Sequence, residues 1–200
     1  MTAPRLSFCS RLCAGLLLGA LLVPATATAQ EAAEEPSTQI LSDSLRYDDI
    51  GRTSVFTGNV ILTRGPMTLT ADRLDLREDE QGVRHGVATA DKGKRVRIRQ
   101  ERPEQFDLID ASGLRAEYSE KDDQIDLIGQ AVVIRYICGE AMDTIRGQRI
   151  RYNQTTGLYQ AEGGAESAGP GQRVRSIAQP RSRVDAAIKA CQDKNAAARP

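Results

Sequence analysis

Large and reactive side chains are scarce in this 200-residue chain, which has no Trp, three Phe and one His. Metal sites built from two or three histidines are therefore excluded. His85 lies in the polar turn "EQGVRHGV", the setting of a solvated loop residue. No G-x-S-x-G motif is present, and no Ser or Cys has a histidine base in a catalytic setting. We expect no enzymatic activity, no catalytic residues, no metal and no cofactor.

Net charge is also lacking, because 27 Lys and Arg residues balance 27 Asp and Glu residues. This balance gives no electrostatic basis for binding nucleic acid, so we expect no nucleic-acid partner. The acidic pairs Asp48–Asp49 and Asp122–Asp123 occupy turn positions, which favour Asp. Adjacent residues of a strand point to opposite faces, so neither pair can supply the facing carboxyls of a glycosidase.

The longest apolar run, "AGLLLGALLV" (14–23), is too short to span a bilayer, which argues against a retained membrane anchor. Arg5 and Arg11 precede it, and Ala27 and Ala29 satisfy the A-x-A cleavage rule. The pattern predicts a cleaved signal peptide over residues 1–29 and a mature chain that begins at Gln30.

Cysteine is too sparse to form a disulfide framework. Cys9 and Cys13 belong to the predicted signal peptide, Cys138 lies in an apolar run and Cys191 lies in the tail. An oxidising compartment would allow Cys138 and Cys191 to pair, but two cysteines make no framework. The pattern favours one buried thiol and one exposed thiol, the latter available for an intermolecular bond.

The remaining chain divides into three segments. Residues 30–37, "QEAAEEPS", are acidic and predict a flexible leader. Residues 38–180 are short runs of period two with turn signals roughly every 8 to 12 residues, as in an antiparallel all-β sandwich, roll or barrel. Residues 181–200 are a variable tail, in which Val184, Ile188 and Cys191 would share one side of a short helix.

An internal repeat runs through the predicted β domain. Residues 44–76 align with residues 113–152, so that Gly58 matches Gly129 and "ADRLDL" matches "GQRIRY". Repeats of this kind predict an elongated sheet of similar stacked hairpins, with glycine where a strand bends or bulges.

Alternation along these runs assigns one face of each strand to the interior. Ile61, Thr68 and Thr70 should face outward, and a bulge at a glycine would reverse the assignment beyond it. The residues expected on the interior face are Ile40, Leu45, Tyr47, Phe56, Val60, Leu62, Met67, Leu69, Leu114, Tyr118, Ile125, Leu127, Val133, Ile150 and Tyr152.

An apolar face of this kind is ordinarily the core of a sheet protein. Here the scarcity of large side chains suggests an interior that is not completely filled. An open interior could accept acyl chains, each buried methylene contributing about 0.8 kcal/mol.

The stretch "FTGNVILTRGPMTLTAD" (56–72) resembles the signature F-x-G-N-V-x-[LV]-x-[QR]-G-x-x-x-[LI]-x-A-D of the OstA-like (LptA) family. The resemblance extends from about Thr38 to Pro180. The second copy is degenerate, with Gln130 and Ala131 where Asn and Val are commoner. The resemblance implies nothing about residues 181–200.

This resemblance implies an open, twisted β-jellyroll whose interior face binds the lipid A acyl chains of lipopolysaccharide (LPS) in the periplasm. It also implies head-to-tail self-association into a bridge between an LptC-like inner-membrane protein and an LptD-like outer-membrane protein. Alternatives are an LptC-like or LptD N-terminal-like relative, and a secreted structural β domain with a closed core and no lipid.

Overall fold

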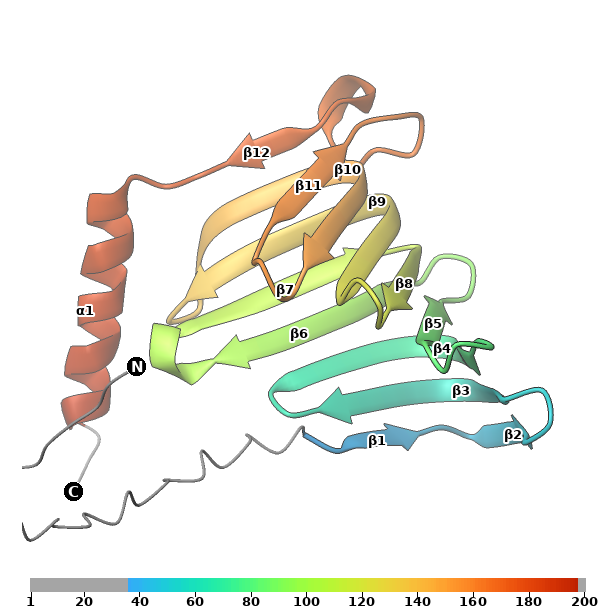
Figure 1. Cartoon of the computed structure of the whole chain (residues 1–200). Helices are drawn as coiled ribbons and strands as arrows, with labels where there is room; N and C mark the ends of the chain where they lie inside the picture. Colours follow the sequence, from blue (N-terminus) through green and yellow to red (C-terminus); the bar gives the residue numbers. More distant parts are fainter. Residues whose placement is uncertain (1–35, 198–200) are drawn as a thin grey trace, which may run out of the picture. The chain divides into compact units, whose positions relative to one another are not determined.

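The computed structural model describes residues 36–197, which belong to the second of two compact units, Glu35–Pro200. The predicted signal peptide (1–29) and most of the predicted leader (30–37) lie outside the described residues. The described chain forms one 12-stranded antiparallel sheet followed by a single helix (Figure 1). The strands are β1 (Thr38–Leu41), β2 (Ser44–Asp48), β3 (Thr53–Arg64), β4 (Met67–Glu78), β5 (Arg84–Thr89), β6 (Val96–Arg102), β7 (Asp107–Gly113), β8 (Arg115–Ser119), β9 (Gln124–Ile137), β10 (Glu140–Asn153), β11 (Tyr159–Glu162) and β12 (Arg175–Ile177).

Short 3₁₀ turns η1 (Pro103–Gln105) and η2 (Pro170–Gln172) interrupt the strands, and α1 (Arg181–Ala197) follows Pro180. The predicted all-β fold is confirmed, as is the helix in the tail. The side of α1 that carries Val184, Ile188 and Cys191 is the less exposed one, as its spacing predicted. Among the described residues, no helix has both the length and the apolarity that crossing a membrane requires.

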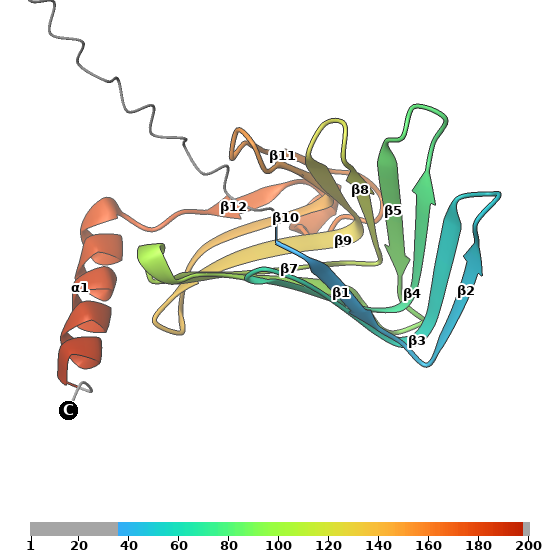
Figure 2. The same ribbon diagram turned by 60° about the horizontal axis from the view of Figure 1, so that its bottom comes forward.

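The sheet consists of two halves, because its four longest strands each bend and pair with different neighbours on either side of the bend. Wall one has the order β1, end of β3, start of β4, β6, β7, end of β9, start of β10, β12. Wall two has the order β2, start of β3, end of β4, β5, β8, start of β9, end of β10, β11. Figure 2 shows the two walls diverging from the bends, and buried apolar residues of both walls belong to one cluster.

The bends lie at the glycines that the internal repeat predicted. In β3, Gly58 and Asn59 both have positive φ (80° and 47°) and together oppose the single residue Asp72 of β4. In β9, Gly129 and Gln130 repeat this geometry (73° and 49°) opposite one residue of β10. Each pair is a β-bulge that re-aims the strand, and glycine supplies the left-handed conformation at little cost. We call the row of these positions the bend line.

In both repeats, the loop that runs from wall two to wall one is hydrogen-bonded to the residue that lies opposite the β-bulge. The Asp72 carboxylate accepts a hydrogen bond from the Asp91 N–H (2.8 Å) and contacts Lys94 Nζ (2.6 Å). At the matching position, Gln148 Oε1 accepts one from the Glu166 N–H (3.3 Å). The lysine contact, followed by the Asp91 N–H, lowers the pKa of Asp72. Both repeats therefore combine a β-bulge with a hydrogen bond that holds the following loop against the bend.

The sheet is open at both ends. Strands β1 and β2 each pair only with β3, and β11 and β12 each pair only with β10, among the residues that the structure describes. Both walls thus present an edge strand at each end. Backbone groups along such edges are available to pair with another chain.

The expectation for the cysteines was wrong, because Cys138 and Cys191 form a disulfide with their Cα atoms 5.7 Å apart. Cys138 occupies an exposed two-residue turn with Gly139, where positive φ values of 51° and 82° reverse the chain between β9 and β10. Because Cys138 lies in an apolar run, sequence analysis did not predict a turn at this position. Cys191 is buried on α1, and the bridge joins the helix to the β9–β10 hairpin.

We predict that this bridge stabilises the fold. It closes a loop of 53 residues, so the chain-entropy estimate gives at most about 4 kcal/mol. The double substitution Cys138→Ser with Cys191→Ser should lower the free energy of unfolding in urea by about 2–4 kcal/mol. Reduced wild-type protein is the matched control, since it keeps both sulfur atoms. Equal unfolding free energies for all three forms would contradict the prediction.

Candidate functional site

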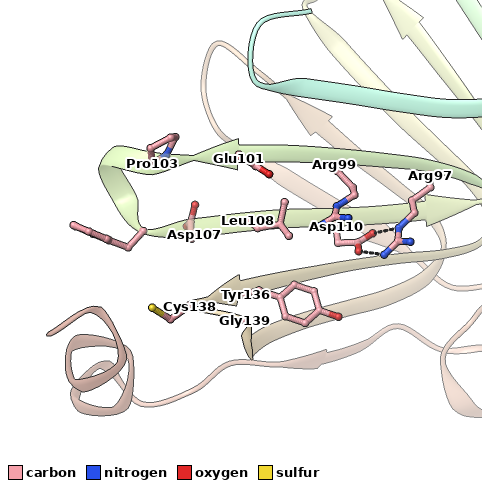
Figure 3. Close-up of a pocket in the computed structure, with 11 residues that line it drawn as sticks. Arg97, Arg99, Glu101, Pro103, Asp107, Leu108, Asp110, Tyr136, Cys138 and Gly139 are labelled. Atoms are coloured by element: carbon pink, nitrogen blue, oxygen red, sulfur yellow. Dashed lines mark hydrogen bonds and ion pairs between the residues drawn. The ribbon is translucent and has the colours of Figure 1, made fainter. Parts of the chain in front are cut away.

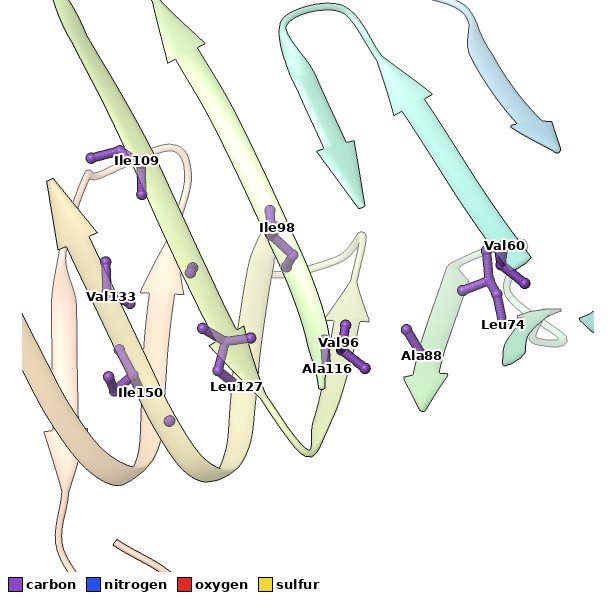
Figure 4. Close-up of a cluster of buried hydrophobic side chains, with 12 residues drawn as sticks. Val60, Leu74, Ala88, Val96, Ile98, Ile109, Ala116, Leu127, Val133 and Ile150 are labelled. Carbon is purple, nitrogen blue, oxygen red and sulfur yellow. The ribbon is translucent and has the colours of Figure 1, made fainter. Parts of the chain in front are cut away.

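A continuous cluster of buried apolar side chains lies between the two walls (Figure 4). Wall one contributes residues such as Val96, Ile98 and Val133, and wall two contributes residues such as Leu74 and Leu127. Several further members are alanines, at positions 88, 111, 116 and 131. Small side chains allow the walls to approach each other near the bend line. Toward the β1–β4 end of the sheet, inward-facing apolar residues are only partly buried, so the facing surfaces there are not fully covered.

Most residues expected on the interior face lie in or against this cluster. Four are buried within it: Val60, Leu127, Val133 and Ile150. Six more pack against it and remain partly exposed: Ile40, Phe56, Leu62, Met67, Leu69 and Ile125. Thr70 and Ile61, expected to face outward, are exposed and pair with each other across β3 and β4. Thr68 is partly exposed on the same side as these two.

Five expected residues lie outside the cluster or at its margin. Leu45 and Tyr47 share a face with Phe56, but at 56% and 64% exposure they stand at the open end of the sheet. Tyr118 is cross-strand from Ile125 and partly exposed, and Tyr152 is partly exposed in wall two. Leu114 departs from the alternating pattern. It is 38% exposed at the corner between β7 and β8, where its N–H meets the carbonyls of residues 128 and 129.

The expected interior set included four of the twelve residues buried in the cluster and missed the other eight. Val96 and Ile98 alternate with arginines, and Ile109 and Ala111 alternate with Leu108, Asp110 and Ser112. The alternation of apolar with charged or polar residues is the feature that could have identified all four as inward-facing.

A charged cluster occupies the inward face of wall one beyond the apolar residues. It consists of Arg102, Asp107, Arg135 and Asp143, which we call the rim network. Arg102 donates two hydrogen bonds to the Asp107 carboxylate (2.8 and 2.7 Å), and Arg135 approaches the same group at 3.9 Å. Arg135 also donates to Asp143 (2.7 Å). The Asp107 side chain is 1% exposed, so a carboxylate is buried at the edge of an apolar face.

Two tyrosines stack on the inward face of wall two. Tyr152 and Tyr159 are stacked, with ring centroids 4.4 Å apart, and Tyr159 packs against the apolar cluster. Burial, followed by Tyr152, raises the pKa of Tyr159 to about 12, with Arg102 lowering it and Asp107 raising it. Burial acts to lower the pKa of Arg102, but the Asp107 pairing raises it, with smaller contributions from Tyr159 and Tyr152.

The opposite face of wall one carries a depression of about 540 Å³ with a mixed charged and apolar lining (Figure 3). Arg97, Arg99, Leu108 and Tyr136 line it, and Arg97 is paired with Asp110. These residues alternate with the buried lining along β6 and β7, so the depression lies outside the space between the walls. Its charged and mixed lining is poorly suited to acyl chains.

Comparisons with known proteins point in one direction. Residues 39–158 match the family model described as LptA/(LptD N-terminal domain) LPS transport protein. Lipopolysaccharide export system protein LptH of Pseudomonas aeruginosa is 27% identical over 169 residues, which are 84% of this chain and 93% of LptH. The crystal structure of LptH, described as the LptA-homologous periplasmic component of a lipopolysaccharide transport device, gives a TM-score of 0.60 at 26% identity. That match covers 72% of this chain and 96% of the LptH chain.

Proposed function

The chain belongs to the family of LptA and the LptD N-terminal domain, and from that premise we propose that it is a periplasmic LPS carrier. In this proposal residues 1–29 are removed on export and residues 38–180 form the carrier domain. The acyl chains lie between the two walls and the phosphorylated sugars stay outside. The observation that carries the proposal is the inward apolar surface that remains partly exposed at Ile40, Phe56, Leu62 and Leu69.

The energetics favour acyl chains as the bound group. A chain of twelve carbons that leaves water gains roughly 9 kcal/mol before the costs of association. Charged residues balance in number, so ion pairing with lipid phosphates contributes less than apolar burial. The protein's own groups hold and shield the lipid and need perform no chemical step.

Assembly follows from the open ends. We propose that the β11–β12 end of one molecule pairs with the β1–β2 end of the next, so that the spaces between the walls become continuous. Contacts of this heterologous kind do not close and so give linear stacks. The end partners would be an LptC-like protein at the inner membrane and an LptD-like protein at the outer membrane.

The second candidate is a structural β domain with a closed core. The buried cluster of small side chains near the bend line favours it. The partly exposed inward residues toward the β1–β4 end of the sheet count against it, because a closed core would cover them.

A matched pair of photo-crosslinkers tests the carrier function. Leu62 and Ile61 are consecutive residues of β3, and Leu62 faces the interior while Ile61 faces outward. The two probes would therefore differ only in the face of the sheet from which they project. A crosslinker in place of Leu62 should label LPS, and one in place of Ile61 should label it at least about tenfold less, because successive side chains leave opposite faces. The readout is LPS attached to the protein after irradiation in cells. Equal labelling from both positions would refute binding between the walls.

A further inference from the structure

The two segments that adjoin the edge strands of wall one carry opposite charges. The leader "QEAAEEPS" (30–37), which precedes β1, contains three Glu and no Lys or Arg. The segment "RVRSIAQPRSR" (173–183) includes β12 and the start of α1, and contains four Arg and no Asp or Glu. We call it the basic segment. Because β1 and β12 lie at opposite ends of wall one (Figure 1), a chain of balanced total charge has one acidic end and one basic end.

The basic segment is held against the β9–β10 hairpin. The Gln179 N–H donates a hydrogen bond to the Asp143 carboxylate (3.0 Å). Arg183 donates to Gln179 Oε1 (3.2 Å) and to the Glu140 carboxylate. Farther along α1, the disulfide joins the helix to the same hairpin. These contacts fix the path along which the chain leaves β12.

The other three arginines of the basic segment are exposed. Within residues 36–197, the guanidinium groups of Arg173, Arg175 and Arg181 form no hydrogen bond and no ion pair. Elsewhere in wall one, by contrast, Arg97 is paired with the cross-strand neighbour of Arg99, Asp110. The end of the sheet that carries β12 therefore presents three cations that can pair with carboxylates of another molecule.

The directions of the edge strands would bring the leader and the basic segment together in a stack. Wall one has eight strands and every neighbouring pair is antiparallel, so β1 and β12 run in opposite directions. A second molecule that places its β1 against β12 therefore continues the antiparallel order. In such a pair, residues before one strand lie beside residues after the other. Glu34 precedes Thr38 by four residues and Arg181 follows Ile177 by four, so the two side chains would meet.

We propose that the acidic leader of one molecule and the basic segment of the next form an electrostatic latch at the joint between stacked molecules. The inference rests on the proposed assembly and deepens it, because main-chain pairing alone does not distinguish one edge strand from another. Exposed ion pairs add little affinity singly, but like charges at a contact suppress the wrong pairing. Two basic segments repel each other, so the latch selects head-to-tail contacts. Its residues are Glu31, Glu34 and Glu35 on one side and Arg173, Arg175 and Arg181 on the other.

Charge reversal on each side of the joint tests the latch in the purified mature protein. An acid-reversed variant carries Glu31→Lys, Glu34→Lys and Glu35→Lys, and a base-reversed variant carries Arg175→Glu and Arg181→Glu. Each variant alone should show a dissociation constant for self-association raised by about tenfold or more, because its joints bring like charges together. An equimolar mixture should associate like wild type, since every joint between the two variants again unites opposite charges. Sedimentation velocity over a range of concentrations measures all three.

A control variant with Lys92→Glu and Lys121→Glu changes the net charge as much as the base-reversed variant does, but at exposed turns away from both edges. It should associate like wild type, and circular dichroism establishes that every variant is folded. Wild-type association that both reversed variants reproduce would overturn the latch and leave the proposed assembly standing. A mixture as weak as its separate components would also overturn the latch, because the charges would then act within one molecule. Wild-type protein that stays monomeric at every concentration would refute the assembly and the latch together.

Discussion

Removal of residues 172–200 should abolish head-to-tail association and leave a folded domain that still binds LPS. The truncation deletes β12, which is the wall-one edge at this end and pairs with β10 through Thr144–Arg146. It also deletes α1, which the Cys138–Cys191 bridge joins to the β9–β10 hairpin. Main-chain pairing at a sheet edge requires an ordered edge strand, so the joint between molecules should be lost. The concentration dependence of the sedimentation coefficient measures the effect.

The truncation needs a control for its lost disulfide. The full-length Cys138→Ser/Cys191→Ser protein is that control, and the truncated protein should carry Cys138→Ser as well. A subtler variant is Ile177→Pro, which removes one backbone N–H from β12 without shortening the chain. Oligomers that form as readily after truncation as before it would show that the C-terminal edge is not the joint.

The substitution Leu69→Glu should lower LPS affinity by about 100-fold or more, because an unpaired carboxylate in an apolar site is costly. Leu69 faces the interior, where its cross-strand neighbours are Leu62 and Ile98. It is partly exposed, so the unliganded domain can hydrate the new charge and remain folded. Lipid bound between the walls would remove that water.

Thr70→Glu is the matched control, one residue along β4 and on the outer face. It adds the same charge to the same strand and should bind LPS like wild type. Circular dichroism and the melting temperature establish that both variants are folded. A similar loss of affinity in the two variants would mean that net charge, rather than the site, controls binding.

The sequence predicted the bends well and the charged rim poorly. Gly58 and Gly129 stood out because both repeats place a glycine at the same point, and both adopt positive φ. Arg102 and Asp107 gave no such signal. Charged residues are usually solvated, and only the pairing of β6 with β7 brings these two together at the inner face. Neither residue belongs to the repeat or to the family signature.

Position within the sheet explains the other differences. The apolar alternation of β2 is the same as that of buried strands, yet Leu45 and Tyr47 are exposed because β2 is an edge. Period-two reasoning also fails at Leu114, since the chain turns a corner there. Cys138 and Cys191 are 53 residues apart in sequence, so only the placement of α1 beside the β9–β10 hairpin could reveal their bridge.

Binding of LPS compared with the same LPS stripped of its acyl chains tests the central claim most directly. Both ligands carry the same sugars and phosphates, so the difference isolates burial between the walls. The account predicts that the deacylated form binds at least about 100-fold more weakly, given about 0.8 kcal/mol per buried methylene. It also predicts that raising salt toward 1 M weakens binding of intact LPS only modestly, since screening acts on exposed charges. Equal affinity for the two forms, or a steep loss of intact LPS with salt, would contradict it.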